Sequence, residues 1–193
     1  MILLLLGLAS FAGLHLFTTV FEAVRDDAVA RIGERPWKLI IAVGLALSVW
    51  LMVRGYGAAP ASVLWSAPGW ARTVVVLAML PVLILYMGSF PGSAIRAYVR
   101  HPQLTGFALW AGLHLLVNGE VRATVLFGGL LLWAVMQIVL LNRRDGTPPL
   151  PAAHGPVLRA WMAVPVGVVV WGLLLWAHQW LFGVSPLAWV FWA

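Results

Sequence analysis

The chain has 193 residues, of which 63% are hydrophobic and only 9% are charged, and its mean hydropathy is +0.97. A water-soluble domain has about 45–50% apolar and about 25% charged residues, so this composition excludes a soluble globular protein, a disordered chain and a DNA-binding domain. We therefore assign the net charge of +6 to loops that orient the chain in a bilayer, with no nucleic-acid partner. Because the chain has no cysteine, thiolate nucleophiles and cysteine-ligated haem are also excluded.

Six apolar segments predict transmembrane helices, since about 20 apolar residues cross ~30 Å of hydrocarbon. They cover residues 1–21, 37–53, 71–90, 102–118, 121–141 and 161–182. We predict an all-α, polytopic helical bundle that forms a single transmembrane domain over residues 1–193. Pairs of small residues predict close helix packing at Ala9/Gly13, Gly88/Gly92 and Gly128/Gly129.

Basic residues between these segments predict the orientation of the chain. Nine of the 12 Lys and Arg residues fall in the first, third and fifth connections, and the other three fall in the remaining connections. By the positive-inside rule the nine residues face the cytoplasm. We therefore expect both termini to lie outside the cytoplasm and the lipid bilayer to be the main partner of the chain.

Three histidines lie in or near the predicted spans, where an ionisable side chain is costly and usually faces the bundle interior or a site. His15 shares a helical face with Phe11, and His114 shares one with Trp110. Neutral imidazole is the common axial ligand of haem iron, so His15 and His114 are candidate metal ligands. His178 is the alternative partner of His114, because helical rise places those two closer in depth. The competing interpretation is a histidine that only hydrogen-bonds a neighbouring helix.

A cationic cluster precedes the fourth predicted span. Arg100 and His101 stand directly before Pro102, and Arg96 lies one turn earlier. Such a cluster can bind a phosphate or a carboxylate, so these three cationic residues are candidate cofactor-binding residues. Ordinary anchoring at the cytoplasmic surface also explains them.

The fourth predicted span and the residues just before it contain residues 99–119, VRHPQLTGFALWAGLHLLVNG, and the fifth contains residues 125–135, VLFGGLLLWAV. Together these stretches resemble the NnrU family of bacterial membrane proteins, which are named for a link to nitrite and nitric oxide reduction. Gly13-Leu-His15 and the tryptophan-containing segment 55–70 also fit the pattern, and the match is looser over the last third. The resemblance implies a multi-pass protein of the bacterial inner membrane, with periplasmic termini.

The same resemblance implies haem b as the cofactor. A plant relative of the family, the 15-cis-zeta-carotene isomerase, is a membrane haem b protein whose haem-binding histidines match His15 and His114. The plant enzyme has a cysteine three residues before the later histidine, where this chain has Ala111. The resemblance implies a redox role in nitric oxide or denitrification metabolism with a respiratory redox partner, or haem-dependent isomerisation of a cis-polyene such as a carotenoid.

Two other functions stay open. The Arg-His-Pro element also occurs in membrane methyltransferases, which predicts S-adenosylmethionine binding near Arg96, Arg100 and His101. Such enzymes carry a Glu pair and a tyrosine-rich tail, and we find neither after the fifth predicted span. A non-enzymatic accessory subunit of a respiratory complex is the third interpretation.

Overall fold

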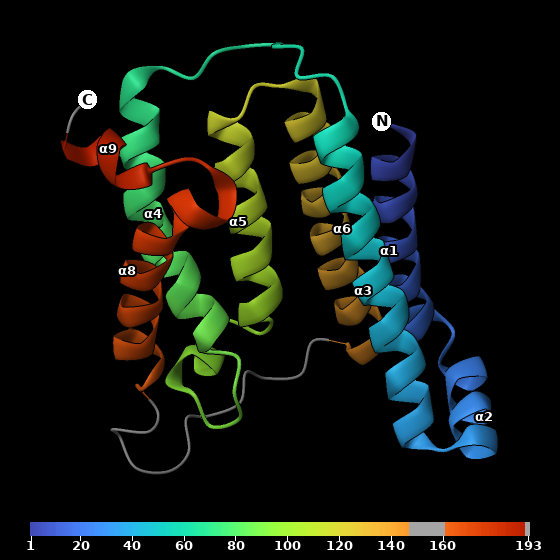
Figure 1. The fold of residues 1–193 in the computed structure, drawn as a ribbon. Coiled ribbons are helices and arrows are strands. Elements are labelled where there is room, and N and C mark those ends of the chain that lie inside the picture. The colour runs from blue at the N-terminus through green and yellow to red at the C-terminus, as the bar shows by residue number, and fades with distance from the viewer. Residues whose placement is uncertain (147–160, 192–193) are drawn as a thin grey trace. The chain divides into compact units, whose positions relative to one another are not determined.

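The computed structural model describes residues 1–146 and 161–191. In that part of the chain the secondary structure is helical (Figure 1), apart from one isolated β-bridge between Val63 and Glu120. Five of these helices are long and apolar enough to cross a membrane. The all-α membrane architecture is therefore confirmed. Contacts divide the chain into two compact units, residues 1–64 with 120–146 and residues 65–119 with 147–193.

The first unit contains four helices. They are α1 (Ile2–Val20), α2 (Glu22–Ile32), α3 (Glu34–Ala58) and α6 (Val121–Asp145). Helix α1 packs mainly against α3 and also against α6. The contact with α3 is close because it is made at glycines: a Cβ added at Gly7 would lie 2.7 Å from Met52 N, and one at Gly55 would lie 2.7 Å from Leu4 Cα.

Helix α2 is an element that the sequence analysis left as a connection between spans. It has no buried residue, but ion pairs one turn apart support it, including Arg31 with Asp27 at 2.9 Å. It ends at Gly33, whose φ of 89° is a conformation that glycine adopts without strain. The third helix begins at the next residue and runs to Ala58, so it is longer at both ends than the predicted span 37–53.

The second unit is built around α4. Its elements are α4 (Gly69–Met87), the short 3₁₀ helix η1 (Ala94–Ala97), α5 (Pro102–Val117), α8 (Ala163–Phe182) and α9 (Pro186–Phe191). Helix α4 packs against both α5 and α8. Again glycines permit the approach: Gly106 of α5 lies against the Val82 carbonyl, and Gly167 of α8 lies against Ile84. With 16 residues, α5 is shorter than the five candidate spans.

The predicted packing pairs Ala9/Gly13 and Gly128/Gly129 are only partly correct. An added Cβ at Gly13 or Gly128 would meet nothing within 4 Å, whereas one at Gly129 would lie 3.0 Å from Leu8 and one at Gly88 would lie 2.7 Å from Ile95. Small residues make close packing possible, but the direction of the helix face decides which of them is used. The connection between the fifth and sixth predicted spans, residues 142–160, begins later than predicted, because α6 continues to Asp145. Two residues of this connection, His154 and the basic residue Arg159, lie outside the described residues.

Candidate functional site

His15 lies in an aromatic cluster of the first unit. Its ring centroid is 4.7 Å from that of Phe11, one turn earlier on α1, and 4.8 Å from that of Trp133 on α6. Trp133 also contacts Phe11 edge-on at 4.8 Å and is only 6% exposed. The predicted pairing of His15 with Phe11 is therefore present, and Trp133 is an addition from a distant part of the sequence. Such a cluster suits the edge of a flat, apolar ligand.

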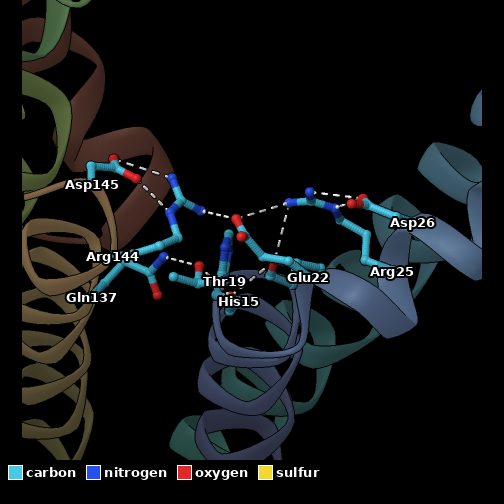
Figure 2. Close-up of polar contacts among 9 residues, drawn as sticks. His15, Thr19, Glu22, Arg25, Asp26, Gln137, Arg144 and Asp145 are labelled. Atoms are coloured by element: carbon cyan, nitrogen blue, oxygen red, sulfur yellow. Dashed lines mark hydrogen bonds and ion pairs between the residues drawn. The ribbon is translucent and has the colours of Figure 1, made fainter.

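Hydrogen bonds continue from His15 along the same two helices. The hydroxyls of Thr18 and Thr19 both donate to the His15 carbonyl, at 2.9 and 3.1 Å. The Nε2 of Gln137, on α6, donates to Thr19 Oγ1 at 2.5 Å. Figure 2 shows these side chains together. A polar amide inside an apolar helix is a functional signal in a membrane protein, and the sequence analysis did not use it.

Charged groups lie beyond Thr19, where α1 meets α2. Glu22 Oε1 is 2.9 Å from Arg144 Nη1 of α6 and 3.9 Å from Arg25 Nη1 (Figure 2). Arg25 and Arg144 each also pair with the acidic residue that follows them, Asp26 and Asp145. The carboxylate of Glu22 therefore joins α2 to α6. These ion pairs are partly exposed, as expected at a membrane surface.

His114 lies near the end of α5 in the second unit. Its ring is 4.9 Å from that of Trp110, which is in turn 5.1 Å from Phe107, so the predicted aromatic face is present. His114 Nδ1 lies 2.9 Å from the Trp110 carbonyl oxygen. A carbonyl only accepts, so Nδ1 carries the proton and donates it, and Nε2 of the neutral ring carries the lone pair. Nδ1–H bonded to a carbonyl is the usual arrangement of a metal-ligating histidine.

His178 of α8 has a similar local arrangement. Its Nδ1 lies 2.9 Å from the Val184 carbonyl oxygen, so its Nε2 also carries the lone pair. His114 on α5 and His178 on α8 both belong to the second unit, so the pair that the sequence analysis kept as its alternative lies within one unit. Among the described residues no group of three or more His, Cys, Asp or Glu could hold a metal ion. Two histidines that ligate one haem iron are a smaller set, to which this finding does not apply.

The predicted cationic cluster lies in the connection between α4 and α5. Arg96 lies in the last turn of η1 and donates through Nη1 to the Ser89 carbonyl at 3.0 Å, so it holds this connection together. His101 is the residue before α5, and its carbonyl accepts from the Thr105 backbone. Arg100 and His101 are 13 or more residues before His114, which is about 20 Å along a helix, so they lie at the other end of α5.

An apolar cavity of about 230 Å³ lies between α4 and α5. Its lining consists of Val82, Leu83, Tyr86, Phe107 and Trp110. Phe107 and Trp110 belong to the same face of α5 as His114, which follows one turn later. Ligand pockets usually measure about 300–1,000 Å³, so this cavity accommodates a segment of an apolar chain or ring and not a whole large ligand.

The chain was compared with known proteins. A family model described as NnrU protein matches residues 3–186. Neither the curated proteins nor the solved structures gave a match.

Proposed function

Because the chain belongs to the NnrU family, we propose that it is a membrane protein that binds haem b, with His114 as one axial ligand. The observation that carries the proposal is the hydrogen bond from His114 Nδ1 to the Trp110 carbonyl at 2.9 Å. This bond sets the tautomer and holds the ring in place, so that Nε2 is the nitrogen whose lone pair a metal would take. The aromatic neighbours Trp110 and Phe107 suit the face of a macrocycle.

We propose His15 as the second ligand, with His178 as the alternative. His15 is supported by its match to the family motif and by its aromatic neighbours Phe11 and Trp133. His178 is supported by its Nδ1 bond to the Val184 carbonyl and by its place in the same unit as His114. Both alternatives use neutral imidazole nitrogens.

The proposed role is redox chemistry in the inner membrane that supports nitric oxide metabolism. When bound, haem b supplies a one-electron centre. The chain then has two tasks: its histidines hold the iron, and its apolar helices keep water from it. Arg96 is already used within the connection before α5, which favours a structural role for this residue over a part in binding S-adenosylmethionine.

A second candidate function is isomerisation of a cis-polyene. The cavity lined by Tyr86, Phe107 and Trp110 favours it, because an apolar chain placed there lies one helical turn from His114. We expect a purified, reduced protein with this function to convert a cis-carotenoid to the trans form, measured by chromatography of the extracted pigment. Oxidation of the reduced protein by nitric oxide without any change in pigment favours the redox role.

The experiment that tests haem binding is an absorption spectrum of the purified protein, oxidised and then reduced with dithionite, with a pyridine haemochrome assay. We expect a Soret band and sharp reduced α and β bands, as for six-coordinate haem b. His114→Gly should lose the haem or become high-spin, and added imidazole should restore the low-spin spectrum.

His15→Gly and His178→Gly identify the second ligand. Only the variant that lacks this ligand should lose the low-spin spectrum and regain it with imidazole, as His114→Gly does. His154→Gly is the matched control, because this histidine falls outside the predicted spans. A colourless protein from haem-replete cells would contradict the proposal and favour an accessory subunit.

A further inference from the structure

The amide of Gln137 has a fixed orientation. The single hydroxyl proton of Thr19 is donated to the His15 carbonyl at 3.1 Å, so Thr19 Oγ1 has only lone pairs left to offer a neighbour. Gln137 must therefore present its NH₂ group to Thr19, as it does at 2.5 Å. The Oε1 atom is consequently an acceptor that points away from Thr19.

This Oε1 atom is buried and has no hydrogen-bond partner among the described residues. Gln137 is only 7% exposed, and an unmade hydrogen bond at such a position is costly. Long side chains on a helix lean toward its N-terminus, which for Gln137 is the direction of Trp133, one turn earlier. The Trp133 ring contacts the ring of His15.

The ring of His15 is the complementary group. Its carbonyl accepts from two threonines, but neither ring nitrogen has a hydrogen-bond partner in the described part of the chain. A neutral imidazole has one N–H to donate. His114 and His178 each bond a carbonyl oxygen through Nδ1, so His15 is the candidate ligand that lacks such a bond within its own helix.

We propose that Gln137 is the positioning residue of His15, its Oε1 accepting the Nδ1–H when Nε2 binds iron. The inference rests on the proposed function, with His15 as a ligand. An acceptor on Nδ1–H orients the ring and makes Nε2 a stronger donor to the metal. Thr19 thereby affects His15 indirectly, because its hydroxyl oxygen accepts from the Gln137 NH₂ group and so sets which end of the amide faces His15.

The test is a pair of variants, Gln137→Leu and Gln137→Glu, in the haem-loaded protein, with Gln179→Leu on an exposed position of α8 as the matched control. Haem dissociation is followed by transfer to apomyoglobin, and the midpoint potential is followed by spectroelectrochemistry. We expect Gln137→Leu to lose haem about 10-fold or more faster and to have a raised midpoint potential, since loss of the hydrogen-bond partner of a metal-bound histidine typically costs about 10–100-fold in metal affinity. Gln137→Glu should lower the potential, because a carboxylate is a stronger acceptor.

Thr19→Val provides a second route that keeps the glutamine, and we expect it to shift the potential in the same direction as Gln137→Leu. Helix content by circular dichroism separates this effect from misfolding. If the wild-type protein binds haem but all three variants match it in dissociation and potential, the role of Gln137 is refuted and haem binding stands. If the wild-type protein binds no haem, or binds it unchanged after His15→Gly, the inference is refuted as well, in the first case together with the proposed function.

Discussion

Replacing Gly55 with alanine tests the closest helix contact of the first unit. A Cβ at this position in α3 would lie 2.7 Å from Leu3 C and 2.7 Å from Leu4 Cα, and it would also overlap Leu4 N. All three are backbone atoms of α1, so no side chain can rotate to make room. Leu4 itself is 0% exposed, so α1 is tightly packed at the point where the added methyl group would press on it.

The magnitude follows from the separation that the methyl group requires. Carbon atoms in contact lie about 3.5–4.0 Å apart, so α1 and α3 must move apart by roughly 1 Å at this point. Overpacking of this kind costs about 1–3 kcal/mol. Gly57→Ala is the matched control in the same helical turn, since an added Cβ there meets nothing within 4 Å. That substitution should be neutral or stabilising by up to about 1 kcal/mol, because alanine favours a helix more than glycine does.

The assay is unfolding of both variants in detergent, monitored by tryptophan fluorescence and circular dichroism. We expect Gly55→Ala to be about 1–3 kcal/mol less stable than Gly57→Ala, which is the steric cost alone, because both substitutions gain the same helix preference. Equal stability of the two variants would refute the close contact of α1 with α3 at Gly55.

Two further substitutions test polar contacts between helices. Trp171 Nε1–H donates to the Val76 carbonyl at 2.9 Å, so Trp171→Phe should lower the free energy of unfolding in detergent by about 1 kcal/mol. The control Trp180→Phe, at a 72% exposed position, should lower it little. Equal losses in the two variants would contradict this bond between α8 and α4. Glu22→Gln breaks the 2.9 Å ion pair with Arg144, whose side chains are 43% and 34% exposed, and should cost at most about 1 kcal/mol. The loss should shrink at high salt, and a loss that is independent of salt would argue against an ion pair.

The sequence was sufficient to place the apolar helices, though not all their ends, and to predict the aromatic faces of the histidines. Length and hydropathy predict helices, and a period of 3.6 places Phe11 beside His15 and Trp110 beside His114. Helix α2 was missed because the search followed apolar runs, while this helix depends on charges one turn apart, such as Asp27 and Arg31. A search for such pairs would have found it.

Contacts between distant segments were not predictable in the same way. Trp133 lies in a motif of the fifth span, but nothing in a single sequence tells which helix its side chain meets. The same holds for the glycines: Gly13 and Gly55 look alike in the sequence, yet only Gly55 faces a neighbouring backbone. Periodicity fixes the relative angles of residues on one helix, and packing between helices fixes what each face meets.

Hydroxyl and amide side chains in these helices differ in how strongly they indicate a functional site. Thr18, Thr19 and Ser48 all donate to a carbonyl three or four residues earlier, so each is satisfied within its own helix. Such a residue needs no partner and indicates no site. Gln137 is different, because its side chain is too long for this local bond and reaches another helix with one atom while a second atom remains unsatisfied. An unsatisfied acceptor in an apolar surrounding destabilises the protein unless a bound state supplies a donor for it. The glutamine beside His15 is therefore a stronger indication of function than the hydroxyl groups around it.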